Sequence, residues 1–308
     1  MATPTKLVII GSGPAGLTAA IYAARADLEP IVITGDQPGG QLTTTTTVDN
    51  WPGGPEGIMG PVLMQNMMTQ AEKFGATLVR ENADHVDLHQ PPFQITTSGG
   101  TTYAADAVIL ATGASPRTLG VPGEKEFWAK GVHTCATCDG FFYKGREVAV
   151  IGGGDSAMEE ALFLAKFATK VTVIHRRDAL RASQAMIERA QNTKNIEWMW
   201  NSEVTAFEGS DHFESLALKN TVDGSTSSFK TDGAFLAIGH VPNTTFFKEF
   251  VATTETGYVS SDHPPFTSID GVFVAGDVSD DKYRQAITAA GSGCKAALEA
   301  QWYLKHGR

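Results

Sequence analysis

The sequence predicts an α/β protein with two Rossmann-like nucleotide-binding domains, the second inserted into the first. Three observations predict this class: a strand, glycine-rich turn, helix and strand near the N-terminus, a second such unit from residue 147, and a further apolar strand after each unit. The chain has 308 residues, which suits two domains of ordinary size.

The first unit starts with an apolar run at residues 6–10, which is typical of a buried parallel strand. The turn at 11–16 reads Gly-Ser-Gly-Pro-Ala-Gly and leads into an alanine-rich helical stretch at 17–26 and a second strand at 30–34. Glycines in this setting let the backbone approach a pyrophosphate, which the helix N-terminus attracts. We therefore expect a dinucleotide at this turn, and a plain chain reversal is the alternative.

The second unit repeats this order, with strands at 147–151 and 170–174, a glycine turn at 152–157 and a helix over 158–168. Its second strand is followed by basic residues, namely His175, Arg176, Arg177 and Arg181. A site for NAD usually has an acidic residue here, whereas basic groups bind the 2′-phosphate of NADPH. We expect NADPH at this unit, and a solvated basic patch is the alternative.

Each unit is followed by another short apolar strand, at residues 107–111 and 234–238. Stretches at 113–123 and 239–245 come next, contain glycine and proline, and are expected to connect the domains. The segment after the second connection is too short for a third domain, so we expect it to complete the first one. The predicted domains are residues 1–115 and 245–308 for FAD, and residues 116–244 for NADPH and a cysteine pair.

FAD is the expected occupant of the first unit, because bound NADPH needs a redox partner. Asp36 follows the second strand later than the ribose-binding acid of a standard site, so it fits the pattern imperfectly. A later apolar strand ends at Gly276 and Asp277, and a helical stretch follows at 286–304. The Asp277 carboxylate could accept a hydrogen bond from a ribityl hydroxyl, which favours a flavin segment here.

Cys135 and Cys138 precede the second unit and are separated by two residues. At this spacing they can form a redox-active disulfide or supply half of a zinc site. Zinc needs two further ligands, and neither Cys294 nor His133 fits that role, so we expect a redox pair and no metal. Cys294 is expected to be a buried structural thiol. Asp139 could shuttle a proton during thiol exchange or serve as a turn residue, and the residues alone leave both open.

The composition limits the classes of function. The formal net charge is −10, which argues against general nucleic-acid binding. The N-terminus lacks the features of a secretory signal, and no apolar stretch is long enough for a membrane span. Three cysteines cannot form an extracellular disulfide framework, so we expect a cytoplasmic protein that binds neither nucleic acid nor membrane.

Together these motifs resemble the low-molecular-weight thioredoxin reductases, over essentially all 308 residues. The most specific part is Cys-Ala-Thr-Cys-Asp-Gly at residues 135–140. The other matching segments are 11–16, 39–42, 50–53, 111–114, 152–157, 175–177, 239–244, 276–278 and 284–286. Asp155 departs from the family, which often has asparagine there, and we expect no functional change from it.

The resemblance implies a homodimer held mainly through its FAD domains, with the NADPH domain inserted. The residues that it places at FAD are Gly11, Ser12, Gly13, Pro14, Ala15, Gly16, Thr34, Gly35, Gly39, Gly40, Gln41, Leu42, Asn50, Ala111, Thr112, Gly113, Gly276, Asp277, Arg284, Gln285 and Ala286. The residues that we expect at NADPH are Gly152, Gly154, Asp155, Ser156, His175, Arg176, Arg177, Arg181, Ile238 and Gly239.

The resemblance also implies a route for electrons, from NADPH through FAD to the Cys135–Cys138 disulfide and then to thioredoxin. Cys138 would act on the flavin side, Cys135 would attack the partner disulfide, and Asp139 would serve as acid and base. The nicotinamide and the disulfide both need the flavin, and the dithiol also needs an external partner. We therefore expect the inserted domain to rotate about its two connections.

Other functions are compatible with this fold. A dithiol oxidase of the gliotoxin or holomycin type uses oxygen and lacks the basic cluster, so Arg176 and Arg177 argue against it. A non-catalytic flavin redox sensor would bind FAD without steady oxidation of NADPH. A hydroperoxide-reductase flavoprotein is not expected, because the sequence shows no N-terminal thioredoxin-like domain.

Overall fold

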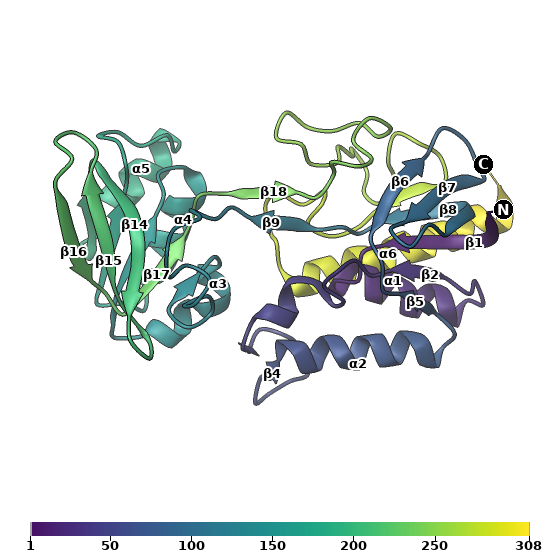
Figure 1. Cartoon of the computed structure of the whole chain (residues 1–308), viewed down its shortest axis with the longest axis horizontal. Helices are drawn as coiled ribbons and strands as arrows, with labels where there is room; N and C mark the ends of the chain where they lie inside the picture. Colours follow the sequence, from purple (N-terminus) through teal and green to yellow (C-terminus); the bar gives the residue numbers. More distant parts are fainter. Residues whose placement is uncertain (1, 308) are drawn as a thin grey trace. The chain divides into compact units, whose positions relative to one another are not determined.

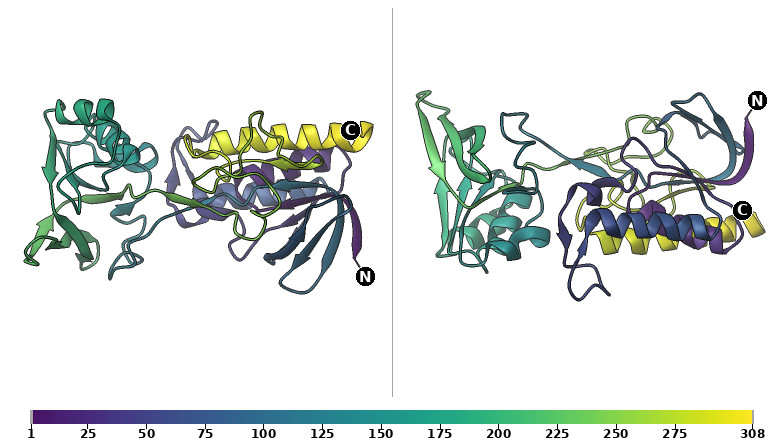
Figure 2. Two further views of the ribbon diagram at one scale, coloured as in Figure 1. Left: turned by 90° about the horizontal axis from the view of Figure 1, so that it is seen from above. Right: turned by 60° about the horizontal axis from the view of Figure 1, so that its bottom comes forward.

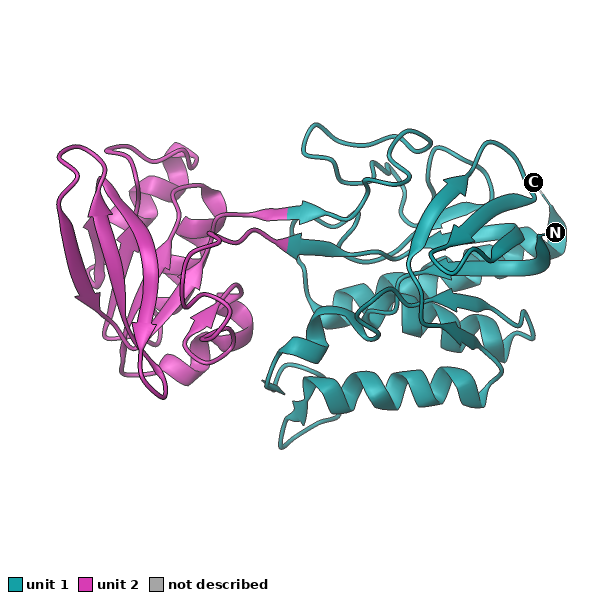
Figure 3. Cartoon of the chain, viewed as in Figure 1, with its two compact units in different colours: residues 1–115, 241–308 teal, residues 116–240 magenta. Residues whose placement is uncertain are grey.

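A computed structural model describes residues 2–307 and divides the chain into two compact units. Unit 1 comprises the chain up to Ser115 and again from Val241, and unit 2 comprises Pro116–His240 (Figure 3). Both units contain a parallel sheet with helices, which confirms the predicted α/β class. The segments that connect the units include strands β9 (Ala114–Pro116) and β18 (His240–Pro242), which pair with each other.

Unit 1 is built on a seven-stranded sheet whose parallel strands have the order β5-β2-β1-β8-β19 (Figure 1). Along one edge of β8, residues 102–105 pair antiparallel with β7, and residues 108–110 pair parallel with β19. The strands are β1 (Thr3–Ile10), β2 (Ile31–Ile33), β5 (Thr77–Val79), β6 (Ala83–Asp87), β7 (Phe93–Thr97), β8 (Thr102–Leu110) and β19 (Val272–Val274).

The main helices of unit 1 are α1 (Pro14–Arg25), α2 (Gly60–Lys73) and α6 (Ala286–His306). Helices α1 and α6 lie side by side, with α6 in yellow in both views of Figure 2. Their backbones come very close, because a Cβ atom on Gly293 of α6 would lie 2.0 Å from the Ala15 carbonyl oxygen. The shorter elements of this unit are η1 (Gly40–Thr44), β3 (Thr47–Val48) and β4 (Ile58–Met59).

Unit 2 contains a five-stranded parallel sheet with the order β13-β12-β11-β17-β10. In both units the strand before the glycine turn is central, with its βαβ partner on one side and the later apolar strand on the other. This shared order confirms two related Rossmann-like folds. The elements are β10 (Val132–His133), α3 (Ala136–Asp139), η2 (Gly140–Tyr143), β11 (Glu147–Ile151), α4 (Asp155–Leu164), β12 (Lys170–Ile174), α5 (Gln184–Gln191), β13 (Ile196–Met199) and β17 (Gly233–Leu236).

An antiparallel sheet that was not predicted from the sequence completes unit 2. It consists of β14 (Ser202–Gly209), β15 (Phe213–Asn220) and β16 (Thr226–Lys230), shown in green in Figure 2. The antiparallel strands β6 and β7 of unit 1 were not foreseen either.

Both faces of each parallel sheet are buried, which explains the continuous apolar runs in the sequence. In β1, Leu7 and Ile9 join one hydrophobic cluster, and Val8 and Ile10 join another. Strand β11 divides its residues between two clusters of unit 2 in the same alternating way. Within residues 2–307 no helix combines the length and apolar character that a membrane crossing requires.

Candidate active site and cofactor sites

The first glycine turn lies at the carboxyl end of β1 and is shaped by backbone contacts. A Cβ atom on Gly11 would lie 2.2 Å from the Ala111 carbonyl oxygen, and one on Gly16 would lie 1.9 Å from the Gly11 carbonyl oxygen. A Cβ atom on Gly13 would have no neighbour within 4 Å. Gly13 is also the N-cap of α1 and provides no side-chain hydrogen bond. The turn therefore offers open space and helix N–H groups, as a pyrophosphate requires.

Ser12 connects three of the segments that were expected at FAD. Its side chain is buried, its Oγ donates to the Thr34 carbonyl oxygen over 2.9 Å, and it accepts from the Gly39 N–H over 3.0 Å. The Gln41 amide donates to the Ala114 carbonyl oxygen. The segments at 11–16, 34–35 and 39–42 thus converge at the carboxyl ends of the parallel strands, where open α/β sheets bind ligands.

Asp277 carries a buried acceptor without a donor. Its Oδ1 has no hydrogen-bond partner among the residues that the structure describes. Burial, and to a lesser extent the nearby Asp280, raise the pKa of Asp277 to about 7, and Arg284 opposes the shift. A buried carboxylate oxygen needs a donor, and a ribityl hydroxyl could provide one. The residues present therefore fit a flavin dinucleotide.

Replacing Asp277 by asparagine is expected to remove a pH dependence of stability. The folded-state pKa of about 7 lies above the ordinary value of 3.8, so the unfolded chain releases this proton at lower pH. The folded state therefore loses stability as the pH rises from about 4 to about 7, by at most roughly 4 kcal/mol. Chemical unfolding of the flavin-free protein across this range measures the effect. The exposed Asp262→Asn variant is the control and should keep the wild-type slope, and an unchanged slope in Asp277→Asn would contradict the assignment.

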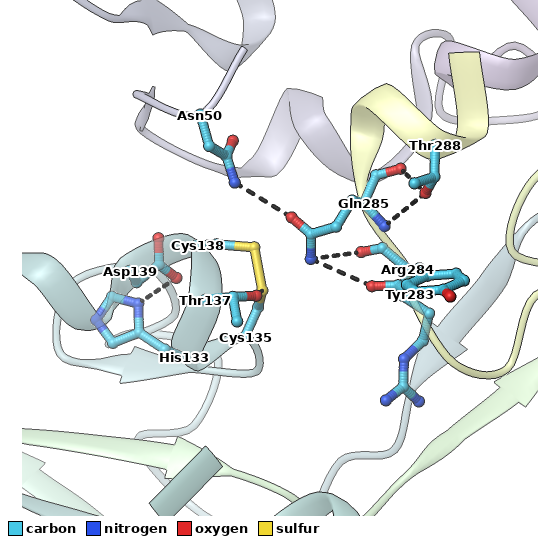
Figure 4. Close-up of a disulfide and its surroundings, with 10 residues drawn as sticks. All are labelled: Asn50, His133, Cys135, Thr137, Cys138, Asp139, Tyr283, Arg284, Gln285 and Thr288. Atoms are coloured by element: carbon cyan, nitrogen blue, oxygen red, sulfur yellow. Dashed lines mark hydrogen bonds and ion pairs between the residues drawn. A yellow bond between two sulfur atoms is a disulfide. The ribbon is translucent and has the colours of Figure 1, made fainter. Parts of the chain in front are cut away.

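The segment before α6 is organised by Gln285. This residue is the N-cap of α6 and forms a capping box with Thr288. Its amide donates to the carbonyl oxygens of Tyr283 and Arg284, over 3.3 and 3.1 Å, and its Oε1 accepts from Asn50 over 3.2 Å (Figure 4). The structure thus brings together Asn50 and Gln285, two residues that were expected at FAD and are far apart in the sequence.

Two contacts in unit 1 were not predicted as part of the site. The Asn243 amide donates to the Thr112 carbonyl oxygen over 2.9 Å, and the Thr112 hydroxyl donates to the Asn243 carbonyl oxygen over 2.8 Å. The Gly276 N–H donates to the Ser292 hydroxyl over 2.8 Å. Asn243 lies in the matching segment 239–244, but its bonds to Thr112 join residues 131 positions apart, so no local pattern could have shown them.

The second glycine turn resembles the first in its contacts. A Cβ atom on Gly152 would lie 2.4 Å from the Ala237 carbonyl oxygen, whereas one on Gly154 would have no neighbour within 4 Å. Gly154 is the N-cap of α4 without a side-chain hydrogen bond. Ile238 and Gly239 follow β17 at the carboxyl end of the same sheet. This geometry also suits a pyrophosphate.

Two residues expected at NADPH have partners inside the protein. The Asp155 carboxylate accepts from the Ser183 N–H and hydroxyl, over 2.9 and 2.8 Å, and these bonds lower the pKa of Asp155. His175 is buried beside Gly153, and its Nε2 lies 3.1 Å from the Ala179 carbonyl oxygen. Burial and the neighbouring arginines lower the pKa of His175, so it is a poor cation. The exposed basic residues are Arg176, Arg177 and Arg181.

Cys135 and Cys138 form a disulfide at the start of α3, with their Cα atoms 5.3 Å apart (Figure 4). The expected disulfide is therefore confirmed. Cys138 is exposed and Cys135 is half-buried. Exposure alone thus does not identify Cys135 as the sulfur that attacks a partner.

Asp139 contacts a buried histidine rather than serving only as a turn residue. The His133 Nδ1 lies 2.9 Å from Oδ2 of Asp139, and the His133 Nε2 lies 2.7 Å from the Tyr143 hydroxyl. From the sequence, His133 was weighed only as a zinc ligand, and this contact was not predicted. No group of residues suited to a metal ion occurs within residues 2–307.

Cys294 is half-buried, so the expectation of a buried thiol was wrong. Helix α6 packs on α1 at Gly293, where the two backbones are too close for a larger residue. Cys294 lies beside this contact and forms a side-chain hydrogen bond with Tyr22.

Comparisons with known proteins cover nearly the whole chain. The family described as pyridine nucleotide-disulphide oxidoreductase matches residues 5–293. Thioredoxin reductase from Mycolicibacterium smegmatis is 52% identical over 303 residues, which are 98% of this chain and 97% of the relative. The solved thioredoxin reductase from Giardia duodenalis is 44% identical, with a TM-score of 0.93 and coverage of 98% and 99%. That from Streptococcus pyogenes is 38% identical, with a TM-score of 0.93 and coverage of 99% of both chains.

Proposed function

The chain belongs to the pyridine nucleotide-disulphide oxidoreductases and, within them, to the thioredoxin reductases, and on this premise we propose that it reduces thioredoxin with electrons from NADPH by way of FAD. The observation that carries the proposal is the Cys135–Cys138 disulfide in a chain with two open glycine turns before helices. The balanced reaction consumes NADPH, a proton and the thioredoxin disulfide, and it yields NADP⁺ and the thioredoxin dithiol.

We assign FAD to unit 1. The open turn at Gly13 and the first N–H groups of α1 would hold the pyrophosphate, and Asp277 would accept from a ribityl hydroxyl. FAD, when bound, supplies a centre that accepts a hydride and delivers two electrons to a disulfide. Ser12, Thr34 and Gln285 hold segments of this site in place through their hydrogen bonds.

We assign NADPH to unit 2, with the open turn at Gly154 for the pyrophosphate and the exposed arginines for the 2′-phosphate. His175 then acts by holding the loop that carries Arg176 and Arg177, because its ring is buried and hydrogen-bonded to Ala179. Asp155 acts in the same indirect way through Ser183.

Replacing Arg176 and Arg177 together by alanine is expected to raise the KM for NADPH about a hundredfold and to change the KM for NADH little. Two charge-assisted bonds to the phosphate would be lost, at roughly 1.5 kcal/mol each. Steady-state kinetics with both nucleotides measures this. The Arg189→Ala variant, on α5, is the control and should match the wild type. An equal loss with NADH would contradict a phosphate-specific role.

The cysteine pair carries the electrons to the partner. When two electrons break the Cys135–Cys138 bond, both sulfurs leave as thiolates, and Asp139 can donate a proton to one of them. The Cys135 thiolate attacks the thioredoxin disulfide, forms a mixed disulfide and releases one thioredoxin sulfur. Cys138 then loses its proton, attacks Cys135, re-forms the disulfide and releases the second sulfur. Asp139 would accept the proton that Cys138 loses, as the family resemblance implies.

Three further expectations complete the proposal, and the first of them rests on the family resemblance. We propose a homodimer held through its FAD domains, a location in the cytoplasm, and rotation of the inserted domain about residues 113–123 and 239–245. The glycine and proline residues in these connections support the last expectation.

An assay with the purified protein, NADPH, thioredoxin and a chromogenic disulfide tests the function. The expected result is colour development that requires both NADPH and thioredoxin. Oxygen-dependent oxidation of a dithiol without need for NADPH would indicate a dithiol oxidase instead. Bound flavin with no oxidation of NADPH would indicate a sensor.

A further inference from the structure

His133 lies at the end of β10 with both ring nitrogens in hydrogen-bond contact. Its side chain is only 8% exposed, and its ring stacks on Phe235 with centroids 5.2 Å apart and planes inclined by 26°. The partners are Oδ2 of Asp139, at the end of α3, and the Tyr143 hydroxyl, at the end of η2. The ring is therefore fixed in position and direction, with the carboxylate on one side and the phenol on the other.

Asp139, His133 and Tyr143 form a hydrogen-bonded series. The positions of its hydrogens can be assigned from the chemistry of the three side chains. Burial raises the pKa of Tyr143 to about 12, so its hydroxyl keeps its proton near neutral pH and can donate to Nε2. A neutral imidazole that accepts at Nε2 carries its hydrogen on Nδ1. Nδ1–H then donates to the Asp139 carboxylate. The phenol thus selects the tautomer in which His133 is a donor to Asp139.

We propose that His133 is a positioning residue, which with Tyr143 keeps Oδ2 of Asp139 as a constant acceptor and leaves Oδ1 to exchange protons with the cysteine pair. The inference rests on the proposed role of Asp139 in the reduction of thioredoxin. It extends that role to two residues that do not touch the sulfurs themselves. No other side chain in the part of the chain that the structure describes has a hydrogen bond to this carboxylate.

Few charged groups act on the hydrogen-bonded series of Asp139, His133 and Tyr143. Asp139 faces His133 directly, and Asp139, Arg146 and Asp232 are the charges that act on Tyr143. Phe235 covers one face of the ring and carries no charge.

Three variants separate the two hydrogen bonds. His133→Phe removes both bonds and keeps a ring against Phe235. His133→Asn keeps an N–H donor close to the position of Nδ1 and loses the contact with Tyr143. Tyr143→Phe keeps the imidazole and removes only the phenol that fixes its tautomer.

We expect His133→Phe to slow thioredoxin reduction about tenfold and to shift the pH midpoint of that activity, because the Asp139 carboxylate loses the donor at its Oδ2. His133→Asn should recover most of the rate and the original midpoint. Tyr143→Phe should lie between His133→Phe and the wild type. NADPH–ferricyanide activity, which does not need the dithiol, should stay unchanged in all three.

A second readout uses the cysteines alone. After reduction of the disulfide in the flavin-free chain, the rate of alkylation by iodoacetamide is measured against pH, and His133→Phe should shift this profile in the same direction. Wild-type profiles in both experiments, or an equal loss in His133→Asn and His133→Phe, would overturn the proposal. If the wild type reduces ferricyanide but not thioredoxin, the proposed function fails, whereas the alkylation profile still decides the role of His133.

Discussion

Replacing Cys138 by serine is expected to reduce the rate of thioredoxin reduction by at least about a thousandfold, because the variant has no disulfide to accept two electrons. It also has no second thiol to resolve a mixed disulfide with the partner. NADPH–ferricyanide activity should remain, since it needs neither cysteine. Parallel assays with thioredoxin and ferricyanide measure the two halves of the reaction separately.

Cys294→Ser is the matched control for this prediction. The thiol of Cys294 is free and half-buried, and serine can keep a hydrogen bond with Tyr22. Its activity should stay within about twofold of the wild type, as for most substitutions away from a site. Thioredoxin reduction by Cys138→Ser at the wild-type rate would show that electrons bypass the pair.

The same variants decide which sulfur attacks the partner. Cys138→Ser keeps Cys135 and should form a stable mixed disulfide with thioredoxin, which a non-reducing gel detects. Cys135→Ser should form much less of it, although Cys138 is the more exposed residue in the structure. Preferential trapping by Cys138 would reverse the assigned roles.

Much of the fold could be predicted because its central strands are buried on both faces. Strands β11 and β12 begin and end at the residues expected, 147–151 and 170–174, since an uninterrupted apolar run has clear limits. Helix α4 begins three residues earlier than expected, because the residues of its glycine turn already enter the helix. The strand β16 was missed because four of its five residues are exposed, so it has no apolar pattern.

The candidate site could be predicted where a motif is local. The glycine turns and the cysteine pair are short sequences whose spacing follows from their geometry. His133 and Tyr143 could not be predicted in this way, because their bonds depend on how β10, α3 and η2 pack together. His175 and Asp155 show the converse, since they carry the right chemistry for a ligand but bond to Ala179 and Ser183.

Replacing Gly16 by alanine is expected to destabilise unit 1 by at least about 3 kcal/mol, because the added methyl group would overlap with backbone atoms. Its Cβ would lie 1.9 Å from the Gly11 carbonyl oxygen and 2.8 Å from the Gly11 carbonyl carbon. Neither atom can move without separating α1 from the end of β1. Chemical unfolding of the flavin-free protein measures this loss.

Gly13→Ala changes the same turn by the same single methyl group and has the opposite expected result. Nothing lies within 4 Å of the added atom, and the φ angle of −67° at Gly13 suits alanine, so unfolding should change by less than about 1 kcal/mol. The methyl group would instead occupy the space through which a pyrophosphate reaches the backbone, and the Kd for FAD should rise about a hundredfold. Flavin fluorescence titration measures the second effect. If Gly13→Ala binds FAD as the wild type does, the open space at this glycine is not the pyrophosphate site, whereas loss of stability in both variants would mean that the turn serves the fold alone.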